Sequence, residues 1–328
     1  MLRNSERTVL QFDVRMEGSA AGGRNGAISG LTPLSMKAAM QLVKRLFDKG
    51  DLLSRQDRSE TITWYLADVE VTSGYASLLI NRSDKGSADF VLSEPRARRR
   101  RVIQKRGGEG ADYSAHVVIN LNAFGPNMYR ASVEHCPGLS ISRLEFLLNL
   151  ILRTCGKEYR DEMMRPHPNG SVEKDGSPKQ VVLRNRLIFS GHPSDALLRE
   201  LQSGKVESMV LIDQRQRTRP WDSNGYIIED VREVKLKVNP AKILMAIRDT
   251  IKSVCKEADS KHWGRLRVRF QTVTGINRSV LFDTSNASVL DEDRYIKKEV
   301  LKNFSAPLTA SVEKLHPEIV RGMKLLAR

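Results

Sequence analysis

The chain has 328 residues, and its 54 Lys and Arg residues outnumber 39 Asp and Glu residues, which gives a net charge of +15. Hydrophobic residues make up 40% of the sequence and charged residues 28%, which excludes a chain that is disordered throughout. No apolar run approaches the roughly 18–20 residues of a bilayer span, and no signal peptide follows Met1, so we expect a cytoplasmic protein. The positive charge predicts a polyanionic partner, either nucleic acid or an anionic membrane surface.

The first half of the chain alternates strand patterns with helix patterns. A strand at 7–16 precedes a glycine-rich loop at 18–30, which lacks the spacing of the known phosphate-binding loops. Between Pro33 and Lys49, apolar residues recur every three or four positions and predict a helix that ends at Gly50. The elements predicted after it are a hairpin of 61–71 with 75–81, a hairpin of 116–121 with 128–135, and a helix at 140–155 that ends at Gly156.

Residues 166–179 are rich in Gly and Pro and predict a linker between two lobes, residues 1–165 and residues 180–328. The C-terminal lobe repeats the mixture of strands and helices. Its predicted strands are 181–190, 206–213, 233–238, 265–272 and 279–283, and its predicted helices begin near Ser194 and span 240–257, with a helical tail from Asp291. These elements indicate an α+β fold of two lobes, with mainly antiparallel sheets and packed helices.

The cysteines give no sign of a disulfide framework or a metal centre. They are odd in number, widely spaced and without a Cys-x-x-Cys motif. His135 and Cys136 are adjacent and could form half of a metal or nucleophilic site, but Pro137-Gly138 favours the end of a strand at a turn. We therefore expect no metal and no cofactor.

The positive charge is clustered along the sequence. Residues 265–270 alternate Arg with Leu, Val and Phe, so a strand would place every arginine on one face and the apolar residues on the other. Residues 234–238 alternate lysine in the same way. The candidate nucleic-acid-binding residues are a tract of Arg96, Arg98, Arg99, Arg100, Arg101, Lys105 and Arg106, a loop with Arg215, Arg217 and Arg219, and the strand positions Lys235, Lys237, Arg265, Arg267 and Arg269.

This clustering predicts that the chain binds nucleic acid by neutralising phosphates, a mode that depends little on sequence and strongly on salt. Only Trp221 and Trp263 lie beside basic clusters, which favours duplex DNA over single strands that stack on aromatic rings. RNA stays open as an alternative. A membrane-surface role fits less well, because no basic amphipathic helix carries a bulky aromatic face.

Two other functions remain open. Asp213 or Asp222 upstream of Glu233-Val234-Lys235 resembles the acidic residues of a Mg²⁺-dependent nuclease, although the same residues arise on any charged strand face. We therefore expect a protein that is not an enzyme and assign no catalytic residue. The third function is a module that recognises an acidic protein partner.

Short stretches, in order along most of the chain, resemble a known family. The stretch Trp64-Tyr65-Leu66-Ala67-Asp68-Val69-Glu70-Val71-Thr72-Ser73-Gly74, and later Met128-Tyr129-Arg130-Ala131-Ser132-Val133 leading through Pro137-Gly138 into Ser140–Leu147, is similar to RexA-like proteins. These are the DNA-binding components of two-gene phage-exclusion systems. The resemblance implies a homodimer that binds DNA without strong sequence preference and signals to a membrane effector protein. It places no individual functional residue, and the 96–106 tract and the tail depart from it.

Overall fold

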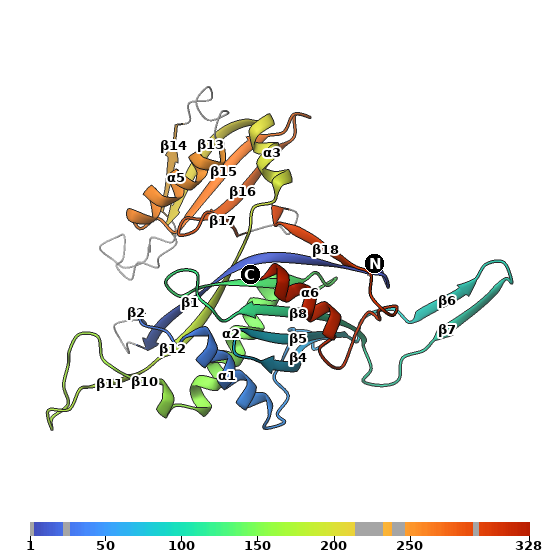
Figure 1. Ribbon diagram of the computed structural model, residues 1–328, viewed down its shortest axis with the longest axis horizontal. Helices are drawn as coiled ribbons and strands as arrows, with labels where there is room; N and C mark the ends of the chain where they lie inside the picture. Colours follow the sequence, from blue (N-terminus) through green and yellow to red (C-terminus); the bar gives the residue numbers. More distant parts are fainter. Residues whose placement is uncertain (1–2, 22–26, 214–231, 238–246, 291–294) are drawn as a thin grey trace. The chain divides into compact units, whose positions relative to one another are not determined.

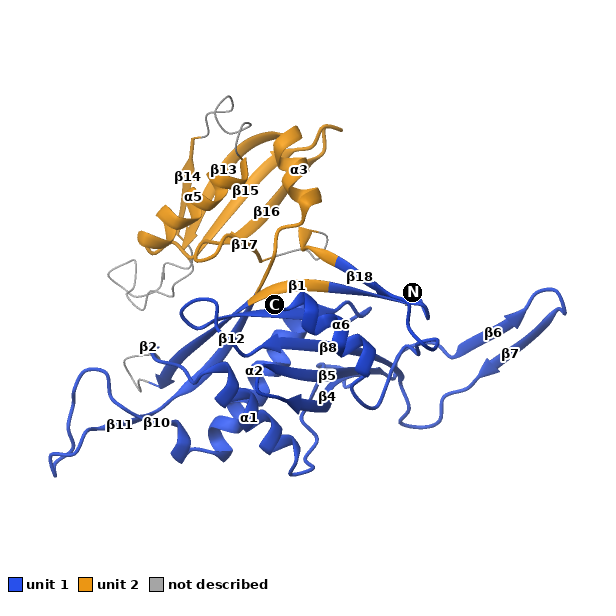
Figure 2. Ribbon diagram, in the orientation of Figure 1, with its two compact units in different colours: residues 1–9, 14–189, 299–328 blue, residues 10–13, 190–298 orange. Residues whose placement is uncertain are grey.

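A computed structural model describes residues 3–21, 27–213, 232–237, 247–290 and 295–328 (Figure 1). Its residues form two compact units, coloured separately in Figure 2. Unit 1 comprises residues 1–9, 14–189 and 299–328, and unit 2 comprises residues 10–13 and 190–298. The fold is α+β with antiparallel strand pairing, as the sequence predicts.

Unit 1 is built on a sheet whose strands follow the order β12-β1-β9-β8-β5-β4-β3. These strands are β1 (Glu6–Ala21), β3 (Ser54–Gln56), β4 (Ile62–Val71), β5 (Tyr75–Asp84), β8 (Ala111–Asn120), β9 (Met128–Glu134) and β12 (Arg184–Gly191). The strands β2 (Ala27–Leu31) and β18 (Lys298–Lys302) pair with β1. Both hairpins predicted for the first half are therefore confirmed, as β4-β5 and β8-β9.

Three helices pack on this sheet. The helix α1 (Met36–Phe47) contacts β4 and α2 (Ile141–Glu158), and α6 (Pro317–Leu326) contacts β8 and β9. The Ser35 hydroxyl caps α1 by accepting the Ala38 N–H at 3.2 Å, which satisfies one of the free amides of the first turn. The helix α2 continues past Gly156 to Glu158, three residues beyond the predicted end at 155, and a 3₁₀ turn at Asp161–Met163 follows it. Among the described residues, no helix is both long and apolar enough to cross a membrane.

A buried ion pair ties the first strand of unit 1 to its centre. Arg7 Nε lies 2.8 Å from Glu134 Oε1, and both side chains are almost completely buried. The other carboxylate oxygen of Glu134 lies 2.6 Å from His116 Nδ1. His116 Nε2 accepts the backbone N–H of His316 at 3.0 Å, so the Nδ1–H donates to Glu134. The network therefore links β1, β8, β9 and the segment that leads into α6.

Two expectations about domain organisation differ from the structure. The segment 166–179 joins β10 (Met164–Pro166) to β11 (Gln180–Val182), which pair with each other inside unit 1, and the chain enters unit 2 at residue 190. The tail from Asp291 was predicted to be helical with breaks at Pro307 and Pro317, which is wrong for 298–302. These residues form β18 because they pair with β1, which lies almost 300 positions earlier in the chain. A local sequence pattern cannot indicate such a distant partner.

Unit 2 consists of a sheet with helices on one face. The strands follow the order β14-β13-β15-β16-β17. They are β13 (Lys205–Asp213), β14 (Arg232–Leu236), β15 (Arg265–Gln271), β16 (Asn277–Asp283) and β17 (Ser288–Val289), and the helices are α3 (Asp195–Ser203) and α5 (Ile247–Ser260). Leu197 and Leu201 of α3 and Ile251 of α5 pack with Leu266 and Val268 of β15 in one core. The opposite face of the sheet carries the charged residues.

Candidate nucleic-acid interface

The strand β13 has a basic strand on each side. Lys235 of β14 lies opposite Val210 of β13, and Arg267 of β15 lies opposite the same Val210 from the other edge. Residues that face each other across antiparallel strands have side chains on the same side of the sheet. Lys235 and Arg267 therefore share one face, on either side of β13.

Alternation along the strands adds further positive side chains to this face. On β15, Leu266, Val268 and Phe270 are completely buried in the core, whereas the arginines between them are partly or fully exposed. The alternation predicted for residues 265–270 is therefore confirmed. Lys237 directly follows β14, two residues after Lys235, so alternation places it on the same side as Lys235, and it is exposed. We call the following set the basic face: Lys235, Lys237, Arg265, Arg267 and Arg269.

Two carboxylates lie close to the basic face. Arg267 Nη1 pairs with Glu233 Oε1 at 3.1 Å, and both side chains are partly exposed. Asp283 of β16 lies opposite Arg265 in the strand register and is buried. Within the described part of the chain, Arg267 is the only member of the basic face that forms an ion pair. Four cations are therefore available to an external anion.

The groups between the two basic strands are apolar. Val210 and Ile212 are only 5% and 2% exposed, in a position that the aliphatic stems of Lys and Arg can cover. No aromatic ring is among the described residues that β13, β14 and β15 direct to this face. Such a surface can contact phosphates but offers no platform on which a base could stack.

A second basic surface is an isolated hairpin that the sequence did not predict. The strands β6 (Phe90–Glu94) and β7 (Arg99–Ile103) pair only with each other, and every residue in them is exposed. Figure 1 shows this hairpin standing apart from the other strands of unit 1. We call residues 90–103 the arm. Its basic residues are Arg96, Arg98, Arg99, Arg100 and Arg101, all exposed.

The two remaining members of the predicted tract lie at the base of the arm. Lys105 Nζ donates to the carbonyl of Lys85 at 2.8 Å and also to the carbonyl of Ser87. Its backbone N–H donates to Asp89 Oδ1 at 3.2 Å. Lys105 therefore holds the base of the arm against residues 85–89 of the same unit. Arg106 donates its backbone N–H to the Glu109 carboxylate and keeps an exposed side chain.

The predicted loop with Arg215, Arg217, Arg219 and Trp221 lies outside the described residues. Trp263, the other tryptophan beside a basic cluster, packs partly buried against the core of unit 2.

The residues of the nuclease alternative do not converge. Glu233 lies opposite Ile212, and Asp213 lies opposite Arg232, so alternation places the Glu233 and Asp213 carboxylates on opposite faces of the sheet. Glu233 is also held by Arg267. Asp222 is outside the described residues. Among those described, no three His, Cys, Asp or Glu side chains form a group that could hold a metal ion.

The cysteines are buried in the packing of both units. Burial raises the pKa of each thiol to about 12, so almost none is ionised at neutral pH. A neutral, buried thiol is a poor nucleophile, and Cys136 in particular packs at a strand end followed by a turn. The three residues are Cys136, Cys155 and Cys255.

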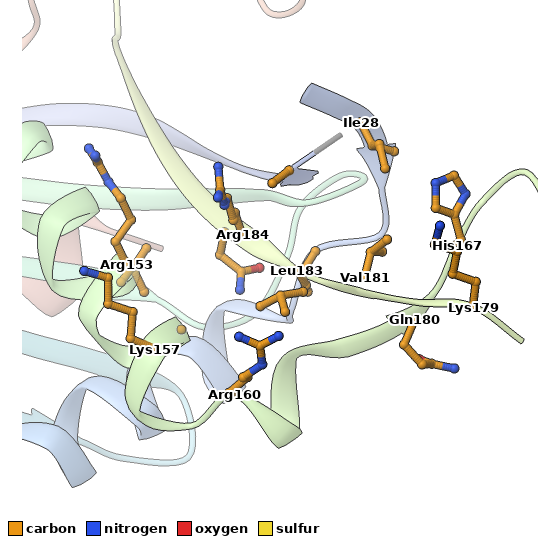
Figure 3. A pocket seen from close by; sticks show the side chains of 15 residues that line it. Ile28, Arg153, Lys157, Arg160, His167, Lys179, Gln180, Val181, Leu183 and Arg184 are labelled. Carbon is orange, nitrogen blue, oxygen red and sulfur yellow. The ribbon is translucent and has the colours of Figure 1, made fainter. Parts of the chain in front are cut away.

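A third group of basic residues was missed in the sequence. It surrounds a cavity of unit 1 between the end of α2 and the strands β11 and β12 (Figure 3). The recognisable signal was the spacing of Arg153, Lys157 and Arg160, at steps of four and three, which places them on one side of a helix. Their partners at Lys179 and Arg184 come from the segment interpreted as a linker and the strand after it.

Comparison of the chain with family models, with curated proteins and with solved structures finds no match.

Proposed function

We propose that this protein binds duplex nucleic acid, and DNA in the first place, through the basic face of unit 2. The observation that carries the proposal is the convergence of five cations from two strands on one sheet face, four of them without an ion-pair partner among the described residues. Like charges gathered on a strand face repel each other, so an external polyanion is the natural partner.

The dimensions of the face suit a duplex. From Arg265 to Arg269 the strand rises about 14 Å, at about 3.4 Å per residue, which is close to the roughly 12 Å width of the DNA major groove. A duplex carries one phosphate charge per about 1.7 Å of its axis, so several phosphates come within reach of the basic face. Since such contacts touch only the backbone, we expect little sequence preference.

The arm extends this proposal. It carries five exposed arginines in its turn and along β7, and an exposed two-stranded ribbon is one of the elements that can enter a groove of DNA. We propose that the arm adds phosphate contacts of its own. Lys105, which holds the base of the arm, is left out of the interface.

The test is a salt-titrated binding assay with duplex DNA, single-stranded DNA and duplex RNA of equal length, with and without Mg²⁺. We expect duplex DNA to bind most tightly and equally well in unrelated sequences. Mg²⁺-dependent cleavage would favour the nuclease alternative instead. Absence of binding to every nucleic acid at low salt, together with co-purification of an acidic protein, would favour the protein-interaction module.

The biological setting is part of the proposal. The resemblance to RexA-like proteins supports a sensor of a phage-exclusion system that acts as a homodimer and signals to a membrane effector. Light scattering of the purified protein with and without duplex DNA tests the dimer. A neighbouring gene for a small protein with several membrane spans would support the effector, and a purely monomeric protein in both states would contradict the dimer.

A further inference from the structure

The cavity of unit 1 introduced above has the size of a small-molecule site. Its volume is about 910 Å³, near the upper end of the range for ligand pockets. The last turns of α2, the segment 179–185, and residues Ala21 and Ile28 line it (Figure 3). All of these residues belong to unit 1, so the cavity is independent of the basic face of unit 2.

The lining is strongly and uniformly positive. It contains no Asp or Glu among its described residues, and none of its five cationic side chains forms an ion pair within the described chain. His167, whose Nδ1 accepts the Asn169 N–H at 3.3 Å, is a sixth basic group at its edge. The five cationic residues are Arg153, Lys157, Arg160, Lys179 and Arg184.

The acidic residues nearest in sequence point elsewhere. Glu158 pairs with Lys49 in the turn after α1, and Glu162 pairs with Arg45 of α1 at 2.8 Å, so both carboxylates are bound to cations on that side. The end of α2 thus separates its charges, with acids toward α1 and bases toward the cavity. Attraction to the negative end of the helix dipole accounts for Lys157. It does not account for cations contributed by β12 and by the residue before β11.

The other part of the lining is aliphatic. Leu152 of α2, the run Val181–Leu183 and Ile28 provide apolar side chains beside the charged ones. Phosphate alone would use only the cations, whereas this combination of an apolar wall and five cations in one lining fits a ligand with an organic part and several phosphates. A small molecule also fits this pocket better than a nucleic acid does, because a nucleic-acid backbone lying across the mouth would leave the aliphatic wall uncovered.

We propose that this cavity binds an organic polyphosphate of nucleotide size, with the phosphates among the five cations and the organic part against the aliphatic wall. The site is separate from the proposed nucleic-acid interface. Through it, a small phosphorylated molecule would bind in unit 1 while duplex DNA binds in unit 2.

The test is calorimetric titration of the full chain with ATP and with inorganic tripolyphosphate at constant ionic strength. We expect one ATP per chain and weaker binding of tripolyphosphate, which lacks the organic part. The variant Arg160→Gln, Lys179→Gln, Arg184→Gln should bind ATP at least about tenfold more weakly, because it loses charge-assisted contacts from three segments. These side chains are all exposed, so the variant should keep its melting temperature.

The matched control removes three arginines from the basic face, with Arg265→Gln, Arg267→Gln and Arg269→Gln. It should bind ATP as the parent does and lose affinity for duplex DNA. Equal binding of ATP and tripolyphosphate would overturn the role of the aliphatic wall. No saturable ATP binding, an unchanged affinity in the cavity variant, or displacement of ATP by duplex DNA in the basic-face variant would overturn the small-molecule site. None of these results depends on whether the basic face binds DNA.

Discussion

Removing the arginines of β15 should change the salt dependence of DNA binding by an amount that the structure sets. Each phosphate neutralised contributes about −0.9 to the slope of log K against log salt. The basic face offers four unpaired cations, so it contributes a slope of about −3.6. Raising the salt from about 50 to 200 mM should then weaken this contribution about 150-fold.

The variant Arg265→Gln, Arg267→Gln, Arg269→Gln leaves Lys235 and Lys237 as the cations of this face. The contribution of the face to the slope falls to about −1.8. Raising the salt from about 50 to 200 mM then weakens the contribution of this face to binding only about 12-fold. The loss also frees Glu233 from Arg267, which places an unpaired carboxylate opposite the phosphates. Affinity at low salt should therefore fall alike for every duplex sequence. The fold should persist, since the buried Leu266, Val268 and Phe270 are unchanged.

A control of equal net charge separates position from bulk charge. Arg248, Lys252 and Lys256 are exposed on α5, which covers the other face of the same sheet, and none forms an ion pair in the described chain. Changing these three to Gln lowers the net charge equally but should keep the parent slope. Fluorescence anisotropy with a labelled duplex across the salt range measures all three proteins. Equal slopes for the two variants would refute the basic face as the binding surface.

Three further predictions concern the packing of the two units. Glu134→Gln should lower the free energy of unfolding by about 3–5 kcal/mol, because Arg7 is left buried without its counter-charge; urea denaturation measures this. Burial raises the pKa of all three cysteines to about 12, so about one thiol in ten thousand is ionised at pH 8. A thiol-reactive disulfide should therefore modify no cysteine quickly in the native protein, and should modify all three in denaturant. Gly204→Ala should destabilise by about 1–3 kcal/mol, because its Cβ would lie 2.4 Å from the Gln271 carbonyl oxygen, whereas Gly264→Ala, with open space around it, should melt with the parent.

The strand faces could be predicted because their information is local. In residues 265–270 each arginine is followed by a large apolar residue, and only a strand with one buried face satisfies that pattern. The neighbour of that strand could not be predicted. The two basic strands are joined through β13, which precedes both in the chain, and no local pattern indicates that Val210 would lie between Lys235 and Arg267.

The arm and the cavity could not be predicted from the sequence, for different reasons. The tract at 96–106 has no apolar alternation around its arginines, so it carries no strand pattern of its own; the arm forms because Phe90–Glu94 pairs back across the turn at Arg98. The cavity needs Arg153 and Arg184 to come together across the segment interpreted as a linker. That segment instead folds back as the pair β10-β11, which places residues 179–185 beside α2.

The distribution of charge predicts that this basic chain distinguishes between anions of different shapes. The predicted tract, the basic face and the cavity hold more cations than the net excess of +15, so the rest of the chain carries slightly fewer basic than acidic residues. A surface that is positive everywhere would bind any polyanion anywhere. We expect the exposed strand face to suit the regular row of phosphates in a duplex, and the pocket with its aliphatic wall to suit a single small ligand. The two surfaces should therefore discriminate between these anions by geometry, although both attract them by the same force.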